Sequence, residues 1–396
     1  MKKFNQIALG LFTCFGVVQW VHADSRSQAM GGVGVATASY LTAPLSNPAM
    51  LANYDSERDN FGLLLPFIGG ASDGYLDHQD REDALWDASL QIARFNNNQG
   101  GQVPIHLRDN WQKALTDFDG SYGIADVQAA VALAIPNQYM SANFFVAADS
   151  TTFSFAVVDS GDYEFDFTNG SLLDLGTTYN ELVFTKFDIG LAMASHQDFE
   201  WDFREMSWSL GFTPKYQILH ADFESARMSG MYDNEQLTSS EDGGSVNIDV
   251  GFTFNPTESF TIGVVGKDLV SHSVDILVRD TNGIQRDITL LVEPQYQLGF
   301  GYSTESFTLG FDIDLNARQY IEEYNYERQF IKVGGEMDIW RWIQFRAGYQ
   351  HSLVKHHDDI ISAGFGFTPF GRFGADVAMQ FGEDQVGASA QFKLTF

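Results

Sequence analysis

Apolar and polar residues alternate without interruption at the end of the chain. From Val386 to Phe396 every even-numbered residue is apolar and every odd-numbered residue is polar or small, and Phe373–Phe381 shows the same pattern with apolar residues at odd positions. A period of two residues predicts a β-strand with one apolar face. We therefore expect the chain to end in two amphipathic strands.

The same alternation recurs through the rest of the chain. We predict fourteen strands in all. Their ranges are Phe61–Ile68, Val127–Ile135, Asn143–Val157, Leu182–Ala194, Met206–Leu219, Val246–Phe254, Phe260–Gly266, Ile288–Tyr302, Phe307–Leu315, Phe330–Met337, Trp342–Tyr349, Ile360–Phe367, Arg372–Phe381 and Val386–Phe396. Pro66, Pro214 and Pro294 lie inside three of these ranges and weaken those three predictions, because proline donates no ladder hydrogen bond.

The less apolar face decides between a soluble sandwich and a barrel. This face is rich in Gly and Ser with scattered charges, whereas a sandwich would present Lys, Glu and Thr to water. The charged residues that we expect inside a barrel are Asp249, Asp312, Asp314, Glu336, Arg346 and Asp376. Large aromatic residues on one face and small or polar residues on the other predict an all-β fold, a 14-stranded antiparallel transmembrane β-barrel with lipid outside.

The connections between the predicted strands alternate between short and mostly longer ones. Short connections include Pro136–Gln138, Ser303–Glu305 and Asp338–Trp340. This asymmetry is typical of bacterial outer-membrane barrels, whose short turns face the periplasm. An even strand number places both chain ends there, and the aromatic Phe396 is the expected signal to the barrel-assembly machinery. Residues 81–118 instead show helical spacing and predict two short helices in the first outer loop, either a lid or a loop that packs on itself.

The first residues predict an export signal. Lys2 and Lys3 precede an apolar stretch, and Val21-His22-Ala23 offers small residues for cleavage after Ala23, so residues 1–23 form a signal peptide. The alternative is a lipoprotein acylated at Cys14, which the bulky Phe12 disfavours. Cleavage after Ala23 removes the only cysteine and excludes disulfides and thiol chemistry. The expected location is the outer membrane of a Gram-negative bacterium.

The charge of the chain restricts its partners. Fifty-two acidic against 23 basic residues give a formal charge of -29, which opposes binding to nucleic acid. We expect contacts with membrane lipid and lipopolysaccharide. The acidic segments Asp77–Asp83 and Asp233–Asp242 either bridge to lipopolysaccharide through divalent cations or only keep the surface soluble.

No catalytic motif accompanies the histidines, so we predict no enzyme, no cofactor and no metal site. The run His356-His357-Asp358-Asp359 could hold a divalent cation, and a solvated loop is the simpler interpretation. The cluster Gly31-Gly32-Val33-Gly34 follows no strand and lacks the Lys-Ser/Thr pair of a phosphate loop, which excludes nucleotide binding there.

Residues 24–60 carry the most specific pattern. Met30-Gly31-Gly32 is followed by Asn47-Pro48-Ala49, directly before the first predicted strand. This arrangement resembles the N-terminal region of FadL-like outer-membrane proteins, the long-chain fatty-acid transporter superfamily. Together with Trp342–Tyr349 and Ser362–Phe367, it is most similar to the outer-membrane branch named conjugal-transfer TraF.

The resemblance implies a barrel, residues 61–396, that is closed by its own N-terminal segment, residues 24–60. Gly31, Gly32, Asn47, Pro48 and Ala49 would form this plug, which acts in the fatty-acid transporters as a hatch for hydrophobic ligands that then leave through a lateral opening; the alternative is a simple stopper. Two functions remain. One is passive uptake of a hydrophobic small molecule, which predicts a connected apolar pocket, and the other is a structural or docking role in a conjugal-transfer or secretion assembly, which predicts a lumen packed with charge pairs.

Overall fold

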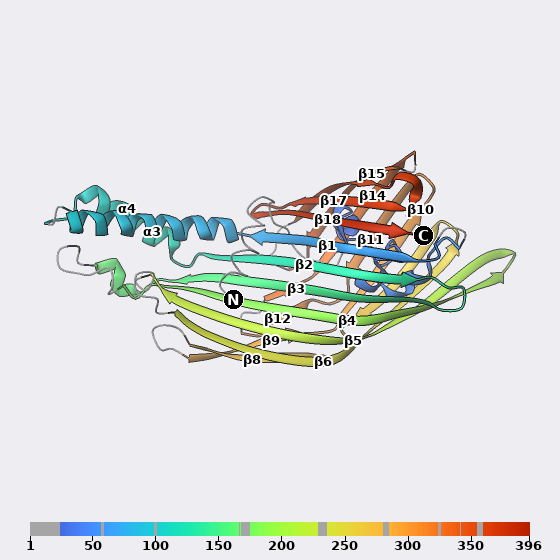
Figure 1. Cartoon of the computed structure of the whole chain (residues 1–396), viewed down its shortest axis with the longest axis horizontal. Helices are drawn as coiled ribbons and strands as arrows, with labels where there is room; N and C mark the ends of the chain where they lie inside the picture. The colour runs from blue at the N-terminus through green and yellow to red at the C-terminus, as the bar shows by residue number, and fades with distance from the viewer. Residues whose placement is uncertain are drawn as a thin grey trace.

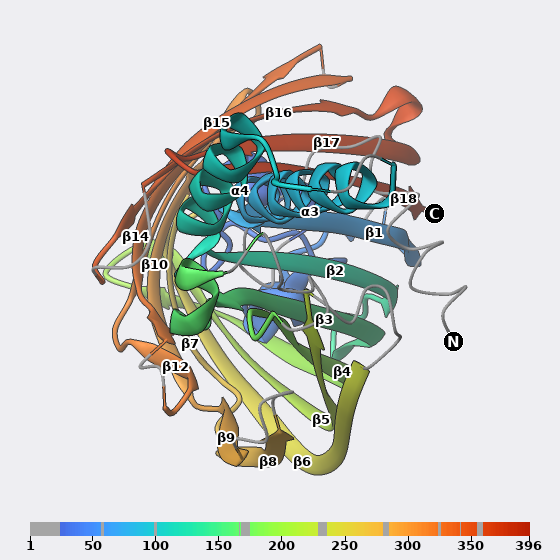
Figure 2. The same ribbon diagram turned by 90° about the vertical axis from the view of Figure 1, so that its left-hand side faces the viewer.

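Fourteen antiparallel strands close into a barrel (Figure 1). The computed structural model describes residues 24–56, 59–98, 101–165, 167, 175–228, 236–279, 285–323, 326–340, 342–354 and 359–396. The predicted signal peptide therefore lies outside the described residues. Strand β1 pairs with β2 on one side and with β18 on the other, which closes the cylinder (Figure 2).

Each predicted run contributes one strand to the wall, so the predicted barrel is confirmed. The barrel strands are β1 (Gly62–Asp73), β2 (Tyr122–Ile135), β3 (Ser141–Val157), β4 (Thr178–Trp201), β5 (Arg204–Arg227), β6 (Gln236–Thr257), β7 (Phe260–Lys267), β10 (Gln295–Ser303), β11 (Phe307–Asp314), β14 (Phe330–Ile339), β15 (Ile343–Ser352), β16 (Ile360–Phe367), β17 (Phe373–Phe381) and β18 (Gln385–Thr395). Outward positions carry exposed large side chains such as Phe187, Leu210 and Phe345, as a lipid-facing wall requires.

A second sheet of four strands was not predicted. It has the order β13-β12-β9-β8 and consists of β8 (His272–Arg279), β9 (Gln285–Val292), β12 (Arg318–Ile321) and β13 (Tyr326–Arg328). The single strand predicted over Ile288–Tyr302 was therefore wrong. Pro294 lies in the gap between β9 and β10, where the chain passes from this sheet to the wall.

The other two prolines also lie at interruptions of pairing. In β1 the register shifts around Pro66 with both neighbours, between Leu64 and Ile68 against β18 and between Leu64 and Phe67 against β2. In β5 the pairs with β4 stop at Lys215 and resume at Phe212, on either side of Pro214. Proline is accommodated where a ladder hydrogen bond is missing.

The two ends of the barrel differ, as predicted. At one end, which we term the turn end, hairpins such as β4–β5 and β14–β15 close over few residues, and Phe396 meets the start of β1 through hydrogen bonds with Asn60 and Phe61. The opposite end, the loop end, carries the second sheet and the longest connections. The β17–β18 connection is an exception, because it is short and lies at the loop end.

Two helices rise from the loop end between β1 and β2 (Figure 1). Helix α3 spans Tyr75–Asn98 and α4 spans Ile105–Phe118, and they pack through residues that include Leu85, Ile92 and Trp111. The expectation of short helices confined to 81–118 was wrong for α3, which has 24 residues and includes the acidic run Asp77–Asp83. Across the described ranges no helix has the length and apolar character needed to cross a membrane.

Two further runs with acidic residues are described only in part. Residues Gln236–Asp242 belong to β6 and not to a loop, and the rest of Asp233–Asp242 lies outside the described residues. Of the run His356-His357-Asp358-Asp359, the structure describes Asp359 alone, which accepts hydrogen bonds from Tyr349 and His351. Short 3-10 helices at Ser160–Glu164 (η3) and Pro369–Gly371 (η6) complete the connections.

The seat of α3 on the barrel predicts a pH response. His78 is fully buried between the rings of Phe118 and Tyr179, and its Nδ1 lies 2.8 Å from the Ser121 hydroxyl. Burial, assisted by the nearby Arg81 guanidinium, lowers the pKa of His78 from 6.5 to about 4. Because the buried form is neutral, stability is complete above pH 6.5 and falls as the pH drops towards 4, by about 3 kcal/mol.

We expect hydrogen exchange of α3 to accelerate between pH 6.5 and pH 4 in the wild-type protein. His78→Phe keeps the ring contacts without a titrating group and should remove this dependence. Burial and nearby carboxylates also raise the pKa of Glu82 to about 7, which acts in the opposite direction. That contribution is shared by both proteins, so their difference isolates His78, and an equal response in both would contradict the prediction.

Candidate functional site

The N-terminal segment lies inside the barrel. Residues 24–56, which we term the plug, include the helix α2 (Ser25–Ala29) and the 3-10 helices η1 (Ala43–Leu45) and η2 (Pro48–Ala52), and almost all residues from Asp24 to Leu51 are buried. Figure 2 shows the plug as the blue segment within the ring of strands. Helix α2 contacts β15–β18, whereas η2 contacts β3–β6, so the plug reaches opposite parts of the wall.

The turn at Met30-Gly31-Gly32 fits against glycines of the wall. Gly31 and Gly32 have φ values of 69° and 76°, a region that glycine occupies without steric cost. A Cβ on Gly334 would overlap the Met30 carbonyl, and one on Gly348 would overlap the Gly31 backbone. The Gly31 amide donates to the Ser362 hydroxyl at 2.8 Å. The inward glycines of β14 and β15 therefore form the surface on which this turn lies.

The Asn47-Pro48-Ala49 element has a similar seat on the other side of the lumen. The fully buried Asn47 side chain accepts from the Ala49 amide at 3.0 Å and donates to the Val35 carbonyl at 2.8 Å. A Cβ on Gly211 would overlap the Pro48–Ala49 backbone. Asn47 thus holds η2 and the preceding segment around Val35 in one fixed arrangement.

All six charged residues that we expected in the lumen point inward. Asp312 accepts hydrogen bonds from the amides of Gly34 and Val35, at 2.7 and 3.0 Å, and so binds the plug backbone. Glu336 pairs with Arg26 of the plug at 2.9 Å and with Arg346 at 2.6 Å.

The remaining members of the set pair with cations of the wall. Arg346 also pairs with Asp376 at 2.7 Å, and Asp314 pairs with Lys332 at 3.2 Å. Asp249 pairs with Lys215 at 2.9 Å. A plug held by charge pairs and backbone hydrogen bonds is fixed in position more specifically than one held by apolar contact alone.

A belt of ion pairs crosses the lumen next to the plug. We term the following residues the ion-pair belt: Asp149, Lys186, Asp188, Lys215, Asp249, Asp268 and Arg318. All of them are buried, and Asp268 lies 2.6 Å from Lys215 and 2.7 Å from Arg318. Beside the belt, Lys267 donates to the Leu45 carbonyl at 2.7 Å and thereby connects this layer to the plug.

An apolar region lies on the loop side of the belt. We term this cluster the apolar basin: Leu182, Phe184, Leu219, Ala221, Phe223, Val274, Ile276, Val278, Ile288, Leu290, Val292 and Ile321. It forms where the inward faces of β4 and β5 pack against the second sheet. The cavity at its border with the belt, between Phe184 and Arg318, has a volume of about 20 Å³.

The inward face of a single strand shows the sequence of layers. Along β4 from the loop end the buried inward residues are Leu182 and Phe184, then Lys186 and Asp188, and then Gly190, whose added Cβ would meet a neighbouring side chain. The apolar basin, the belt and the plug thus follow one another towards the turn end. The order of these layers is present in the sequence at alternate positions of β4. It can be found only by following the inward-facing residues one at a time.

The apolar part of the plug packs on alanines. Tyr40, Leu41 and Met50 contact Ala134 and Ala192 of β2 and β4. A second cluster joins Leu45 to Leu64 and Phe67 of β1, on either side of the register shift at Pro66. The plug therefore meets β1–β4 mainly through small apolar contacts, with hydrogen bonds from Asn143 of β3 to the Tyr40 and Leu41 carbonyls, and meets β14–β18 mainly through polar ones.

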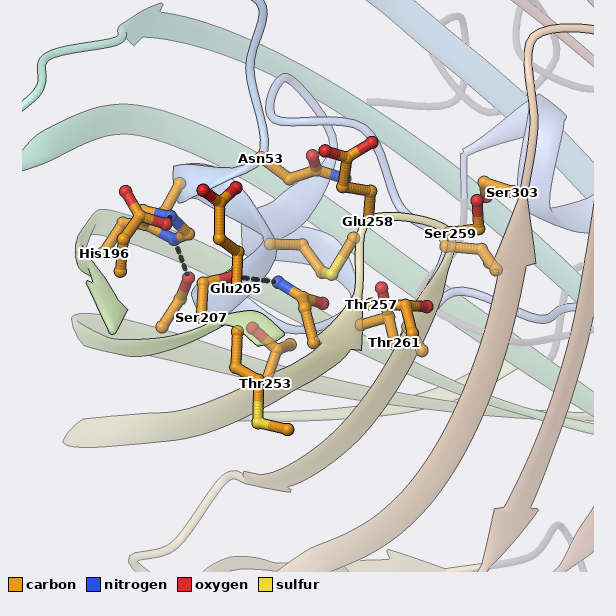
Figure 3. Close-up of a pocket in the computed structure, with 18 residues that line it drawn as sticks. Asn53, His196, Glu205, Ser207, Thr253, Thr257, Glu258, Ser259, Thr261 and Ser303 are labelled. Carbon is orange, nitrogen blue, oxygen red and sulfur yellow. Dashed lines mark hydrogen bonds and ion pairs between the residues drawn. The ribbon is translucent and has the colours of Figure 1, made fainter. Parts of the chain in front are cut away.

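A polar cup opens below the plug at the turn end (Figure 3). The cup has a volume of about 490 Å³, and its wall includes Thr37 of the plug, His196, Glu205 and Ser207 of the β4–β5 hairpin, and Glu258 of the β6–β7 turn. The Thr37 hydroxyl is buried and has no hydrogen-bond partner in the structure. Within the described ranges no group of three or more His, Cys, Asp or Glu residues is arranged to hold a metal ion.

Comparison with known proteins places this barrel in a family. Residues 44–314, more than half of the chain, match the family model for the F plasmid transfer operon TraF protein. The chain belongs to this family. No curated protein matches the sequence.

Solved structures share the fold of this TraF-family protein. The Ralstonia pickettii toluene transporter TbuX matches with a TM-score of 0.56 at 12% identity, over 94% of this chain and 98% of that chain. The P. putida toluene transporter TodX matches with a TM-score of 0.51 at 11% identity, over 94% and 98%. A TodX deltaS2S3 mutant, described as a monoaromatic hydrocarbon channel, gives 0.51 at 11% over 94% and 99%. These matches show that the chain shares the barrel fold of these proteins over nearly its whole length.

Proposed function

We propose that this TraF-family barrel mediates passive uptake of hydrophobic small molecules across the outer membrane, with its turn end in the periplasm. The observation that carries the proposal is the apolar basin at the loop end, a packed core above the belt and the plug that would have to open between the wall and the second sheet to admit a ligand. Burial of apolar surface is the general source of affinity for a hydrophobic ligand. The related folds of TbuX and TodX, described as toluene transporters, support the proposal.

The route that we propose leaves the lumen through the wall. A neutral apolar molecule that crossed the ion-pair belt would separate buried charges from their partners without replacing them, which is costly. The alanine surface beneath Leu41 and Leu45 leads instead to β1, whose ladder is interrupted on both sides at Leu65-Pro66. Movement of the plug from this surface would open an apolar path to the membrane.

Substitution of a basin residue tests this function. Phe184→Asp places a charge in the basin and should lower entry of an apolar fluorescent probe at least tenfold, whereas Phe184→Leu keeps the surface apolar and should retain most of it. The measurement is the rise of fluorescence when the probe reaches phospholipid in cells that produce equal amounts of folded barrel. Equal entry with both variants, or no entry with the wild-type protein, contradicts the proposal.

A structural or docking role in an envelope assembly is a second candidate. Two observations favour it: the lumen contains a belt of ion pairs, and the matched family model is named after a plasmid-transfer operon. This role predicts no probe entry with the wild-type barrel and none with a variant whose plug has been displaced. The comparison of wild-type and plug-displaced proteins therefore separates the two functions.

The remaining partners are part of the same proposal. An outer-membrane position implies contact with lipid and lipopolysaccharide along the exposed apolar wall, and assembly by the machinery that recognises a terminal aromatic residue. Phe396 is 55% exposed, and its ring lies 6.2 Å from that of Phe61, at the seam where β1 meets β18. We propose residues 24–60, which include the plug, as a movable segment and residues 1–23 as the cleaved signal.

A further inference from the structure

The β4–β5 hairpin leaves the wall at the turn end. Pairing of β4 with β3 stops at Ala194, whereas pairing of β4 with β5 continues to Trp201 and Arg204. Figure 1 shows this hairpin reaching farther than the neighbouring turns at this end. At about 3.3 Å per residue, the edge from His196 to Trp201 is about 20 Å long. Along this length β4 has its hydrogen-bonding edge towards solvent.

The tip of the hairpin is built at a conformational cost. Asp202 and Phe203 have φ values of 52° and 60°, which two-residue hairpin turns require and which glycine or asparagine adopts more readily. Phe203 is 95% exposed, so its ring contributes no burial that offsets this cost. A large apolar side chain in such a position is better explained by contact with another molecule than by the fold.

The two faces of the free edge differ in chemistry. The inner face carries His196, Asp198 and Glu200, which lie opposite Ser209, Ser207 and Glu205. This face continues into the polar cup, where Figure 3 shows His196, Glu205 and Ser207 together. The outer face carries Phe199 and Trp201, and Phe199 stacks on Phe254 at 6.5 Å.

We infer that the free edge of β4, from Ser195 to Trp201, binds an extended segment of a periplasmic protein in which basic and apolar residues alternate. An added strand would pair its backbone with β4. Its basic side chains would lie on the inner face beside Asp198 and Glu200, and its apolar side chains would lie beside Phe199 and Trp201. This inference requires the turn end to face the periplasm but does not require the uptake function.

Charge complementarity selects this occupant over a second copy of the chain. Two β4 edges paired with each other would bring the carboxylates of Asp198 and Glu200 together, and like charges on neighbouring strands are destabilising. The cup offers the same selection, because Glu205 and Glu258 line it and the buried Thr37 hydroxyl is available as a hydrogen-bond partner. A basic side chain that extends from the added strand fits both features.

The test uses the whole barrel in zwitterionic lipid nanodiscs and a labelled nine-residue peptide of alternating lysine and valine. We expect this peptide to bind at least tenfold more tightly than a glutamate–valine peptide, and at least tenfold more tightly than a lysine–valine peptide methylated on alternate backbone nitrogens. The double variant Asp198→Lys/Glu200→Lys should reverse the preference between the lysine and glutamate peptides. Phe203→Gly keeps the turn conformation and should weaken peptide binding without reversing the preference for the lysine peptide.

Three results would overturn the inference. Equal binding of the methylated peptide would exclude strand addition, and unchanged selectivity in the charge-reversed variant would exclude recognition by the inner face. Absence of lysine–valine peptide binding to the wild-type barrel would exclude the free edge of β4 as a docking site. Heat-modifiable migration of each variant in gels confirms that the barrel has folded.

Discussion

Gly334→Val is expected to displace the plug and make the barrel conduct ions. A Cβ at this position overlaps the Met30 carbonyl, and the overlapping atom is backbone, so a side-chain rotation cannot relieve it. The β11–β14 and β14–β15 ladders do not involve the plug, so the wall should still close. In planar bilayers we expect at least tenfold more conductance than with the wild-type protein, whose lumen is filled.

Gly335→Val is the matched control for this prediction. Gly335 is the next residue of β14 and faces outward, where the nearest neighbour of an added Cβ is the end of the Leu309 side chain. Its conductance should equal that of the wild-type protein. If both variants conduct equally, the effect comes from the wall and the assigned plug contact is wrong.

Asp268→Asn is expected to destabilise the barrel by about 3–5 kcal/mol, because it removes the carboxylate that pairs with the buried Arg318 and one of those that pair with Lys215. Asp268 is fully buried and pairs with Lys215 and Arg318. Its φ is 51°, a conformation that asparagine also tolerates, so the substitution changes the charge and not the backbone. Urea unfolding in lipid vesicles, followed by tryptophan fluorescence, measures the loss.

A second substitution separates charge from packing in this prediction. Arg318→Met removes the cation that loses its carboxylate partner and should recover at least 1 kcal/mol when combined with Asp268→Asn. A purely steric defect would instead give additive losses in the double variant. Equal stability of Asp268→Asn and the wild-type protein would show that the belt contributes no net free energy.

The barrel could be predicted because its constraint is local. A strand between lipid and lumen must alternate along its own length, so ranges such as Phe373–Phe381 and Val386–Phe396 predict β17 and β18 without any knowledge of their neighbours. The strand β8 alternates as well, but nothing within His272–Arg279 shows that it leaves the wall for a second sheet. Its assignment depends on Pro294 and on contacts with distant strands.

The site was harder to predict from the sequence, because its contacts join residues that are distant in the chain. The segment with Gly31 and Asn47 could be identified from its pattern. The wall residues that it contacts, Gly334, Gly348 and Gly211, are far away in the chain. The apolar basin is likewise formed by β4, β5 and the second sheet together. Such contacts join residues whose spacing in the sequence has no period, so no window of the sequence could have predicted them.

The attachment of α2 has a consequence for biogenesis. The Ser25 amide donates to Gln391 in β18 at 2.9 Å, across 366 positions of the chain, and the Ala29–Gly31 backbone bonds with Ser362 of β16. Residues near the start of the described chain are thus held by β16 and β18. The plug is therefore expected to reach its final position only after β16 and β18 have joined the wall, which would couple closure of the barrel to filling of its lumen.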